Sequence, residues 1–227
     1  MSRIIVFDAD GTLYEGFSIF PLYEAFADEG FIPRSSNDIL QDVLHQYSDK
    51  YIDYNEFVVN TLIVASDVLK GRQLAVANRI SELFFSDPEF SWFGFVKPLI
   101  IETNSLDVET ALLTAEPQFI ASSISNTLGF DECHSSQFTT DDGTFTGNVS
   151  SSLGSSRKGT VTRQLIIDKT KSWAFGDSEG DIGMLELVDT AVCVSPTDTL
   201  RSRAVSESWI IVEDPNNIGF SMQFTKV

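Results

Sequence analysis

The stretch "RIIVFDADGTLYEG", residues 3–16, decides how the chain folds. Its apolar run, residues 4–7, is continuous, which is typical of a strand buried on both faces of a parallel sheet. Asp8 and Asp10 follow at once, so the sequence predicts two carboxylates at the carboxyl end of a strand. Ligands bind at that edge of open parallel sheets, because the loops there lie beside helix N-termini.

Two carboxylates held this close together repel each other unless a positive charge lies between them. A divalent cation is the usual source of that charge, so the pair indicates a metal site. A plainer interpretation stays open, since Asp-Gly is also a favoured turn pair. The position of the pair directly after an apolar strand favours the metal site.

Composition narrows the class of protein. The 227 residues include 33 acidic and 15 basic side chains, giving a net charge of -18, and the basic residues form no cluster. We therefore expect no nucleic-acid-binding surface. No stretch approaches the 18 or more apolar residues of a membrane span, and no apolar leader precedes the first strand. These features predict a cytoplasmic, globular protein that does not insert into a membrane.

The spacing of apolar residues changes twice along the chain. From Ser18 to about Trp92 the sequence has helical spacing, as in Ile19, Leu22, Tyr23 and Phe26, with few strand-like alternations. This pattern predicts a helical segment inserted directly after the first strand. Its many aromatic residues either line a pocket or pack the segment's own core, and packing is the more common role.

Strand-like and helical patterns alternate beyond Pro98. "TALLTAEP" is predicted to be a strand that ends at Thr114, and Pro117 is predicted to start a helix that Gly129 terminates. Asp142 and Gly143 indicate a hairpin turn between two strands. The segments "RKGTVTRQLIIDKT", "GDIGMLELV" and "TDTLRSRAVSE" favour helices, whereas "SWAFGD", "TAVCVS" and "SWIIVED" favour strands. This alternation predicts an α/β fold with a three-layer, Rossmann-like parallel sheet.

Polar residues of complementary kinds mark other strand and helix ends. Thr114 precedes a predicted helix N-terminus, where an anionic oxygen binds well. Lys158 follows a Ser-rich loop, and Asp177 and Asp181 follow an apolar strand. Each has a plain alternative as a helix cap or a solvated surface charge. Together, after parallel strands, they indicate one site at one edge of the sheet.

The segments "FDADGT", "LLTAEP", Lys158 within "RKG", and "GDSEGDIGML" resemble, in order and spacing, the four motifs of the haloacid dehalogenase superfamily. The segments "LGFDECHSSQFTTDDGTFTG" and "VCVSPTDTLRSRAVSESWIIV" resemble its phosphoserine-phosphatase-like branch. The resemblance implies a Rossmann-like core of residues 1–15 and 96–227. It also implies that residues 16–95 form a helical cap of the C1 type.

The resemblance implies a role for each aspartate of the first motif. Asp8 is expected to be the nucleophile that takes a phosphoryl group as an aspartyl-phosphate. Asp10 is expected to protonate the leaving group and then to activate water. General chemistry agrees, because a carboxylate nucleophile splits one hydrolysis into two easier displacements.

The same resemblance implies Mg2+ as the cofactor. Its expected ligands are Asp8, the backbone carbonyl of Asp10, and Asp177. Asp181 is expected either to bind the ion itself or to support the residues that bind it. Hard oxygen ligands suit this ion.

The phosphoryl oxygens are expected to bind Thr114 and Lys158, with help from the backbone amides of Ala9 and Ala115. These groups would offset the negative charge of the transferring group, which is where most catalysis of phosphoryl transfer arises.

The predicted function is Mg2+-dependent hydrolysis of a small phosphorylated metabolite, a phosphate monoester. Asp10 favours phosphoryl chemistry, because superfamily members with other chemistries usually lack an Asp at that position. Two alternatives stay open: a phosphotransferase of the same superfamily, and a non-catalytic binding or regulatory protein with the same fold. Oligomeric state is not predicted.

The sequence departs from phosphoserine phosphatases at two places. Their second motif continues with Gly-Gly, whereas here Ala115 and Glu116 follow Thr114. The cap position that reads the substrate's amino group in those enzymes is occupied by Phe17. These departures disfavour phosphoserine as the substrate, although Glu15 or Glu24 is a possible substitute for the missing acid. The carboxylate of Glu116 is expected to turn outward, as a charge near a helix N-terminus.

Overall fold

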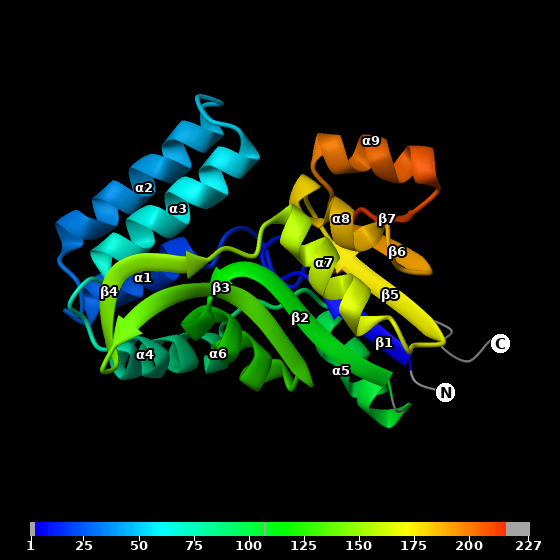
Figure 1. Ribbon diagram of the computed structural model, residues 1–227, viewed down its shortest axis with the longest axis horizontal. Coiled ribbons are helices and arrows are strands. Elements are labelled where there is room, and N and C mark those ends of the chain that lie inside the picture. Colours follow the sequence, from blue (N-terminus) through cyan, green and yellow to red (C-terminus); the bar gives the residue numbers. More distant parts are fainter. Residues whose placement is uncertain (1–2, 107, 217–227) are drawn as a thin grey trace.

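The computed structural model describes residues 3–106 and 108–216, and the centre of this part is a sheet of seven strands (Figure 1). The strands lie in the order β4-β3-β2-β1-β5-β6-β7, and neighbouring strands are parallel except β3 and β4. Their bounds are β1 Arg3–Phe7, β2 Val108–Pro117, β3 Glu132–Asp141, β4 Thr144–Ser151, β5 Lys171–Gly176, β6 Thr190–Val194 and β7 Ile210–Val212. The predicted α/β class with a mainly parallel sheet is confirmed.

Strand β1 lies in the middle of the sheet and is buried on both faces. Ile4 is 1% exposed, and Ile5 and Val6 are fully buried. Val6 is in register with Ala111 of β2 and with Ala174 of β5. The continuous apolar run therefore forms the interior strand that its sequence predicts.

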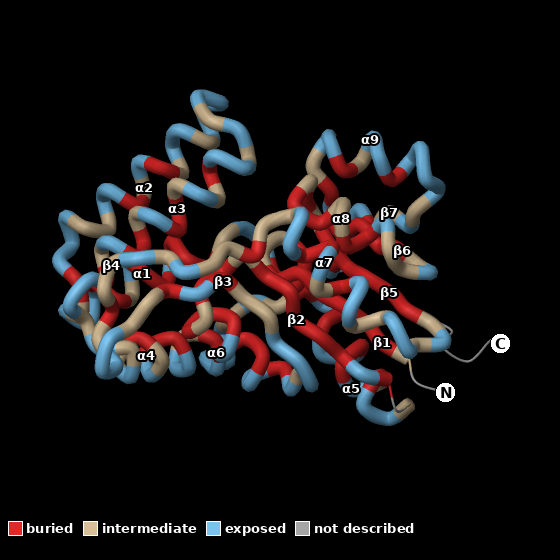
Figure 2. The backbone as a smooth tube through the Cα atoms, viewed as in Figure 1, coloured by how far each residue is buried: buried red, intermediate tan, exposed pale blue. Residues whose placement is uncertain are grey.

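Helices cover both faces of the sheet and make a three-layer fold. Ile5 and Phe7 of β1 belong to a core cluster on one face, with residues of α5 (Val96–Ser105) and α6 (Gln118–Leu128). Figure 2 shows strands β1, β2 and β5 as mostly buried between the layers. Ile4 and Val6 belong to a second cluster on the other face, with residues of three further helices. Those helices are α7 Ser155–Leu165, α8 Ile182–Leu185 and α9 Asp198–Glu207.

Four helices occupy the chain between β1 and α5, as the helical spacing predicts. They are α1 Ile19–Asp28, α2 Arg34–Ser48, α3 Tyr54–Val68 and α4 Leu74–Ser86, and they gather at one end of the molecule (Figure 1). Asp53 and Glu56 form a capping box that fixes the start of α3. Helix α3 contacts β4 and α4 contacts α6, so the helical segment packs closely on the sheet and its helices. The division into cap and core stays a prediction.

Three boundaries differ from those predicted. Strand β2 continues past Thr114 to Pro117, and α6 begins one residue later. The segment after Asp177 is a 3-10 turn, Glu179–Asp181, followed by only four helical residues of α8. Helix α7 begins before the predicted segment and ends at Leu165. The hairpin prediction is confirmed, with φ of 46° at Asp142 and 73° at Gly143 in the turn between β3 and β4.

Within residues 3–106 and 108–216, every helix is too short or too polar to cross a bilayer.

Candidate active site

Asp8 and Asp177 lie side by side because their strands are neighbours in register. Phe7 of β1 pairs with Phe175 of β5, and the N–H of Asp8 donates to the carbonyl of Phe175 over 3.0 Å. Both carboxylates therefore emerge at the carboxyl edge of the sheet. Carboxylate oxygens of Asp8, Asp177 and Asp181 all lie within 4.8 Å of one another. These hard oxygen donors fit a divalent cation, although the second carboxylate beside Asp8 is that of Asp177 and not that of Asp10.

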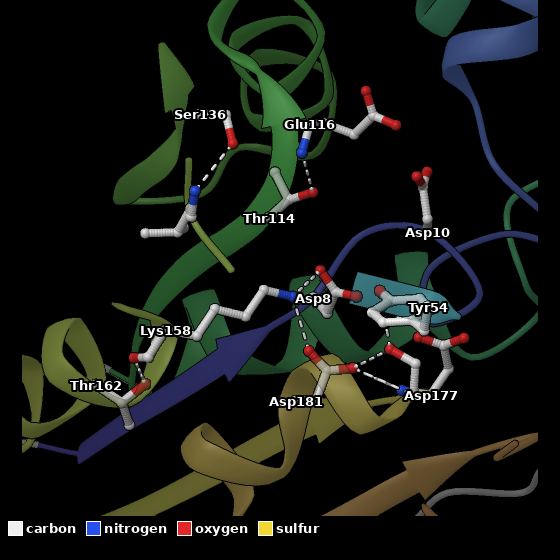
Figure 3. A network of polar contacts seen from close by, with 12 residues as sticks. Asp8, Asp10, Tyr54, Thr114, Glu116, Ser136, Lys158, Thr162, Asp177 and Asp181 are labelled. Carbon is white, nitrogen blue, oxygen red and sulfur yellow. Dashed lines mark hydrogen bonds and ion pairs between the residues drawn. The ribbon is translucent and has the colours of Figure 1, made fainter. Parts of the chain in front are cut away.

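Lys158 forms ion pairs with two members of this acidic group. Its ammonium donates to Asp8 Oδ1 and to Asp181 Oδ1, each over 2.7 Å (Figure 3). All three side chains are at least 94% buried. The predicted surface alternative for Lys158 is wrong, because the lysine is the buried counter-charge of the group.

Asp181 has a supporting position. Its Oδ1 accepts from Lys158, while its Oδ2 accepts the backbone N–H groups of Asp177 and Ser178 over 3.1 and 3.2 Å. Gly176 makes this possible, since a Cβ there would lie 2.5 Å from Asp181 Cβ. Asp181 thus holds both Lys158 and the loop that carries Asp177.

Asp10 is separate from the acidic group, although only one residue separates it from Asp8. Its Oδ1 accepts the hydroxyl of Tyr14 and the backbone N–H of Ser18, the latter over 3.1 Å. Ser18 Oγ lies 2.9 Å from the same tyrosine hydroxyl. The two aspartates therefore have different surroundings, because Asp8 lies beside an ammonium whereas Asp10 lies beside neutral donors and the Glu116 carboxyl.

Thr114 lies near the end of β2 and faces the same pocket as Asp8. It is 1% exposed, and its Oγ1 accepts the N–H of Glu116 over 3.1 Å. Ala115 also lines this pocket, as do Asp10, Lys158 and Asp177. The structure thus brings Thr114 and Ala115 together with the aspartates and the lysine, while Ala9 is buried directly after Asp8. The phosphate-binding roles of these residues stay predictions.

The far wall of the pocket comes from the helical segment. Its lining includes Phe17, Ile19 and Phe20 from the start of α1, and Tyr54, Phe57, Val58, Thr61 and Leu62 from α3. Some aromatic residues of the helical segment thus line a pocket, whereas others, including Tyr23 and Phe26, are fully buried in the core. Both roles left open by the sequence are present.

Glu116 corrects one prediction from the sequence. It is only 5% exposed and lines the pocket, so its side chain does not turn outward. The reason is that β2 continues through Glu116, which points inward from a strand and does not begin the helix. Glu15 and Glu24 are exposed and lie outside the pocket lining, so neither supplies an acid there.

Burial and like charges shift the acidity of the site. Burial and the charge of Asp181 raise the pKa of Asp8 to about 7, against a smaller opposing effect of Lys158. Burial and Asp181 likewise raise the pKa of Asp177. Burial would lower the pKa of Lys158, but Asp181 and Asp8 raise it, so the lysine is charged. Three carboxylates lie around one ammonium in this group, so a divalent cation would offset their mutual repulsion.

Two tyrosines complete the site and were missed by the sequence reasoning. Tyr14 donates its hydroxyl to Asp10. The Tyr54 hydroxyl lies 3.1 Å from Ser178 Oγ (Figure 3). Two residues after Ser178, Gly180 leaves room for the tyrosine, because a Cβ at position 180 would lie only 2.9 Å from the Tyr54 ring. Tyr54 therefore joins α3 to the loop that carries Asp177. For Tyr54, the sequence offered one signal: the residue directly follows Asp53, a favourable helix N-cap, and so lies at a helix start.

The fold and this site agree with a family match. A model of the haloacid dehalogenase-like hydrolases matches residues 5–186, and the chain belongs to that family. Among curated relatives, a phosphoserine phosphatase from Mycobacterium tuberculosis is 35% identical over 105 residues, which is 44% of this chain and 34% of that protein. The chain thus spans about a third of that relative's length. A histidinol-phosphatase from Neisseria meningitidis is 22% identical over 93% of this chain and 99% of its own.

Solved structures show the same fold. A Bordetella pertussis protein of unknown function superimposes with a TM-score of 0.77 at 20% identity, covering 93% of this chain and 99% of its own. A phospho-aspartyl intermediate analogue of phosphoserine phosphatase gives a TM-score of 0.69 at 16% identity, with 95% of each chain covered. Phosphatases are therefore among both the relatives and the structural neighbours of this chain.

Proposed function

We propose that the protein is a Mg2+-dependent phosphomonoesterase that acts on a small phosphorylated metabolite through an aspartyl-phosphate on Asp8. The observation that carries the proposal is the position of Asp8. It lies at the carboxyl end of β1, 2.7 Å from the Lys158 ammonium, and it lines a pocket that also contains Asp10 and Thr114. The residues that we propose as nucleophile, proton carrier and phosphate-binding groups line one pocket, which supports the proposal.

The two aspartates divide the chemistry. An oxygen of Asp8 attacks phosphorus, and the ester oxygen leaves with a proton from Asp10. Asp10 then takes a proton from water, whose oxygen attacks the aspartyl-phosphate and releases inorganic phosphate, restoring Asp8. Tyr14 and Ser18 hold Asp10 in place for both steps by donating to its Oδ1.

Lys158, Thr114 and the amides of Ala9 and Ala115 are proposed to bind the phosphoryl oxygens. Lys158 is already positioned by Asp181, so binding a phosphate requires little reorganisation of its side chain. Asp8, Asp177 and the carbonyl of Asp10 are the proposed Mg2+ ligands. When bound, the ion supplies positive charge that favours the ionised form of Asp8 and offsets the charge of the substrate.

The helical segment, residues 16–95, is proposed to act as a cap over the site. The support is that α1 and α3 form the wall of the pocket opposite the strand ends. Tyr54 of α3 also contacts Ser178 beside the acidic group. A cap that closes in this way excludes bulk water while the phosphoryl group is transferred.

Release of phosphate from p-nitrophenyl phosphate tests the proposal. We expect turnover with Mg2+, none with EDTA, and none in Asp8→Asn. Asp42→Asn, at an exposed position of α2, is the matched control and is expected to keep wild-type activity. Wild-type protein that releases no phosphate, or Asp8→Asn that retains turnover, would overturn the proposal.

The assay also separates the two alternatives. Adding glycerol or a nucleoside would produce a new phosphate ester if the protein transfers phosphoryl groups to alcohols. A purely regulatory protein would bind Mg2+ and phosphate without turnover.

A further inference from the structure

The pocket contains two buried polar atoms that the described part of the chain leaves without a hydrogen bond. They are Glu116 Oε2 and Thr61 Oγ1, on residues that are 5% and 6% exposed. A buried polar atom without a partner is costly, so its position in a pocket points to a ligand group that meets it. Neither atom has a role in the phosphoryl chemistry proposed above.

Glu116 faces the place that the leaving alcohol would occupy. The side chains of Glu116 and Asp10 lie apart from the ion-paired group of Asp8, Lys158 and Asp181 (Figure 3). Asp10 is the proposed donor to the ester oxygen, so a group that reaches Glu116 belongs to the alcohol and not to the phosphate. Glu116 is therefore in a position to contact the alcohol part of the substrate, which determines specificity.

The rest of this wall is apolar. Phe17, Phe20, Phe57 and Leu62 line the pocket with Thr61, and the rings of Phe17 and Phe57 have centroids 4.8 Å apart. Such a wall favours a hydrocarbon or aromatic body in the alcohol. Aromatic faces also attract cations when the cation is desolvated.

The charged side chains that line the pocket indicate which polar group the alcohol carries. The lining includes four carboxylates, on Asp8, Asp10, Glu116 and Asp177, and among the described residues Lys158 is its one cationic side chain. That lysine is already bound to Asp8 and Asp181. A second anionic group on the substrate would find no counter-charge, whereas an ammonium group would pair with Glu116.

We propose that the substrate is the phosphate monoester of an amino alcohol, an alcohol with a short apolar body and a protonated amine that binds Glu116, and that it carries no carboxylate. This substrate class rests on the proposed phosphatase function. Thr61 offers a second hydrogen bond to the same alcohol.

A competing explanation is that Glu116 is protonated and shares its proton with Asp10, because burial and the neighbouring Asp10 raise the pKa of Glu116. In that case the carboxyl group would assist the acid–base step for every ester alike. It would give no preference for an amine. Kinetics on matched substrates separate the two explanations.

The test compares aminoalkyl phosphates with chains of two, three and four carbons against alkyl and carboxyalkyl phosphates of matched length. We expect at least one aminoalkyl ester to have a kcat/KM about tenfold to a hundredfold above its alkyl match, the range for a hydrogen bond to a charged group. The carboxyalkyl ester is expected to be the poorest. Glu116→Gln should reduce the amine preference to near unity, whereas Glu15→Gln, which is exposed, should keep it.

Binding to Asp8→Asn with Mg2+, measured by calorimetry, gives a second readout that needs no turnover. The aminoalkyl ester should bind more tightly than its alkyl match. Equal kcat/KM for both esters in an active wild-type protein would overturn the amine assignment and leave the phosphatase function standing. If the wild-type protein has no turnover but the aminoalkyl ester binds tightly and in a Glu116-dependent way, the amine assignment is supported and the phosphatase function is overturned. Equal binding without turnover would overturn both.

Discussion

At the scale of single residues, the site depends on a buried ammonium shared between two carboxylates. Lys158 lies 2.7 Å from both Asp8 and Asp181, and none of the three side chains is accessible enough for water to replace its partners. Removing one partner of such a group leaves an uncompensated buried charge. The same burial would strengthen the proposed interactions of this group with a cation and a phosphate, because the local dielectric is low.

The pH dependence of stability follows from the raised pKa of Asp8. The ordinary value is 3.8 and the folded value is about 7, so between these values the folded chain keeps a proton that the unfolded chain has released. Stability then falls as pH rises. We expect the free energy of unfolding of the metal-free protein, measured by urea denaturation in EDTA, to decrease from about pH 4 to about pH 7. Asp177 contributes in the same direction.

The control for this prediction is Asp8→Asn, which should make the decrease shallower because one titrating group is removed. Saturating Mg2+ should also reduce the decrease, since the ion favours ionised carboxylates. Stability that rises over this pH range, or an unchanged slope in Asp8→Asn, would show that Asp8 does not hold a proton in the folded chain.

At the scale of elements, the turn after β1 must leave room for Asp177. Gly11 has φ of 69°, and a Cβ there would lie 2.2 Å from Asp177 Oδ2. Gly16 has φ of 80° and no atom within 4 Å of its Cβ position. Alanine at either position adds backbone strain of about 1 to 2 kcal/mol. Only Gly11→Ala also displaces a proposed metal ligand.

We therefore expect Gly11→Ala to lower the apparent affinity for Mg2+ by about tenfold or more, a loss typical of disturbed support around a metal site. Gly16→Ala should lose a similar amount of stability and keep its Mg2+ affinity. Activity titrated with Mg2+, together with urea denaturation of both variants, measures this. Equal Mg2+ affinities in the two variants would mean that the turn does not position Asp177.

Much of the element order was predictable from the sequence, because strand β1 is continuously apolar and the hairpin turn has Asp-Gly. The extent of β2 was not, since Thr114 to Pro117 has no periodic apolar pattern to mark it as strand. That error carried over to Glu116, whose direction depends on whether it belongs to a strand or a helix. The contact between Tyr54 and Ser178 joins residues 124 positions apart, and spacing along the chain does not reveal such a pair.

At the scale of the whole molecule, the helical segment and the sheet share one apolar core. Phe26 of α1 and Phe119 of α6 have ring centroids 6.0 Å apart, and both belong to the cluster that contains Phe7 of β1. We expect a single cooperative unfolding transition, with superimposable curves from far-UV circular dichroism and tryptophan fluorescence. Two separated transitions would instead mean that the helical segment and the sheet unfold independently.

The central claim is that Asp8 carries the phosphoryl group during turnover. Its most direct test is an acid quench of the wild-type protein during steady-state hydrolysis of a radiolabelled phosphate ester, followed by peptide mapping. We predict acid-stable, hydroxylamine-labile label on the peptide that contains Asp8 and none in Asp8→Asn. Label on another residue, or turnover by Asp8→Asn, would contradict the account.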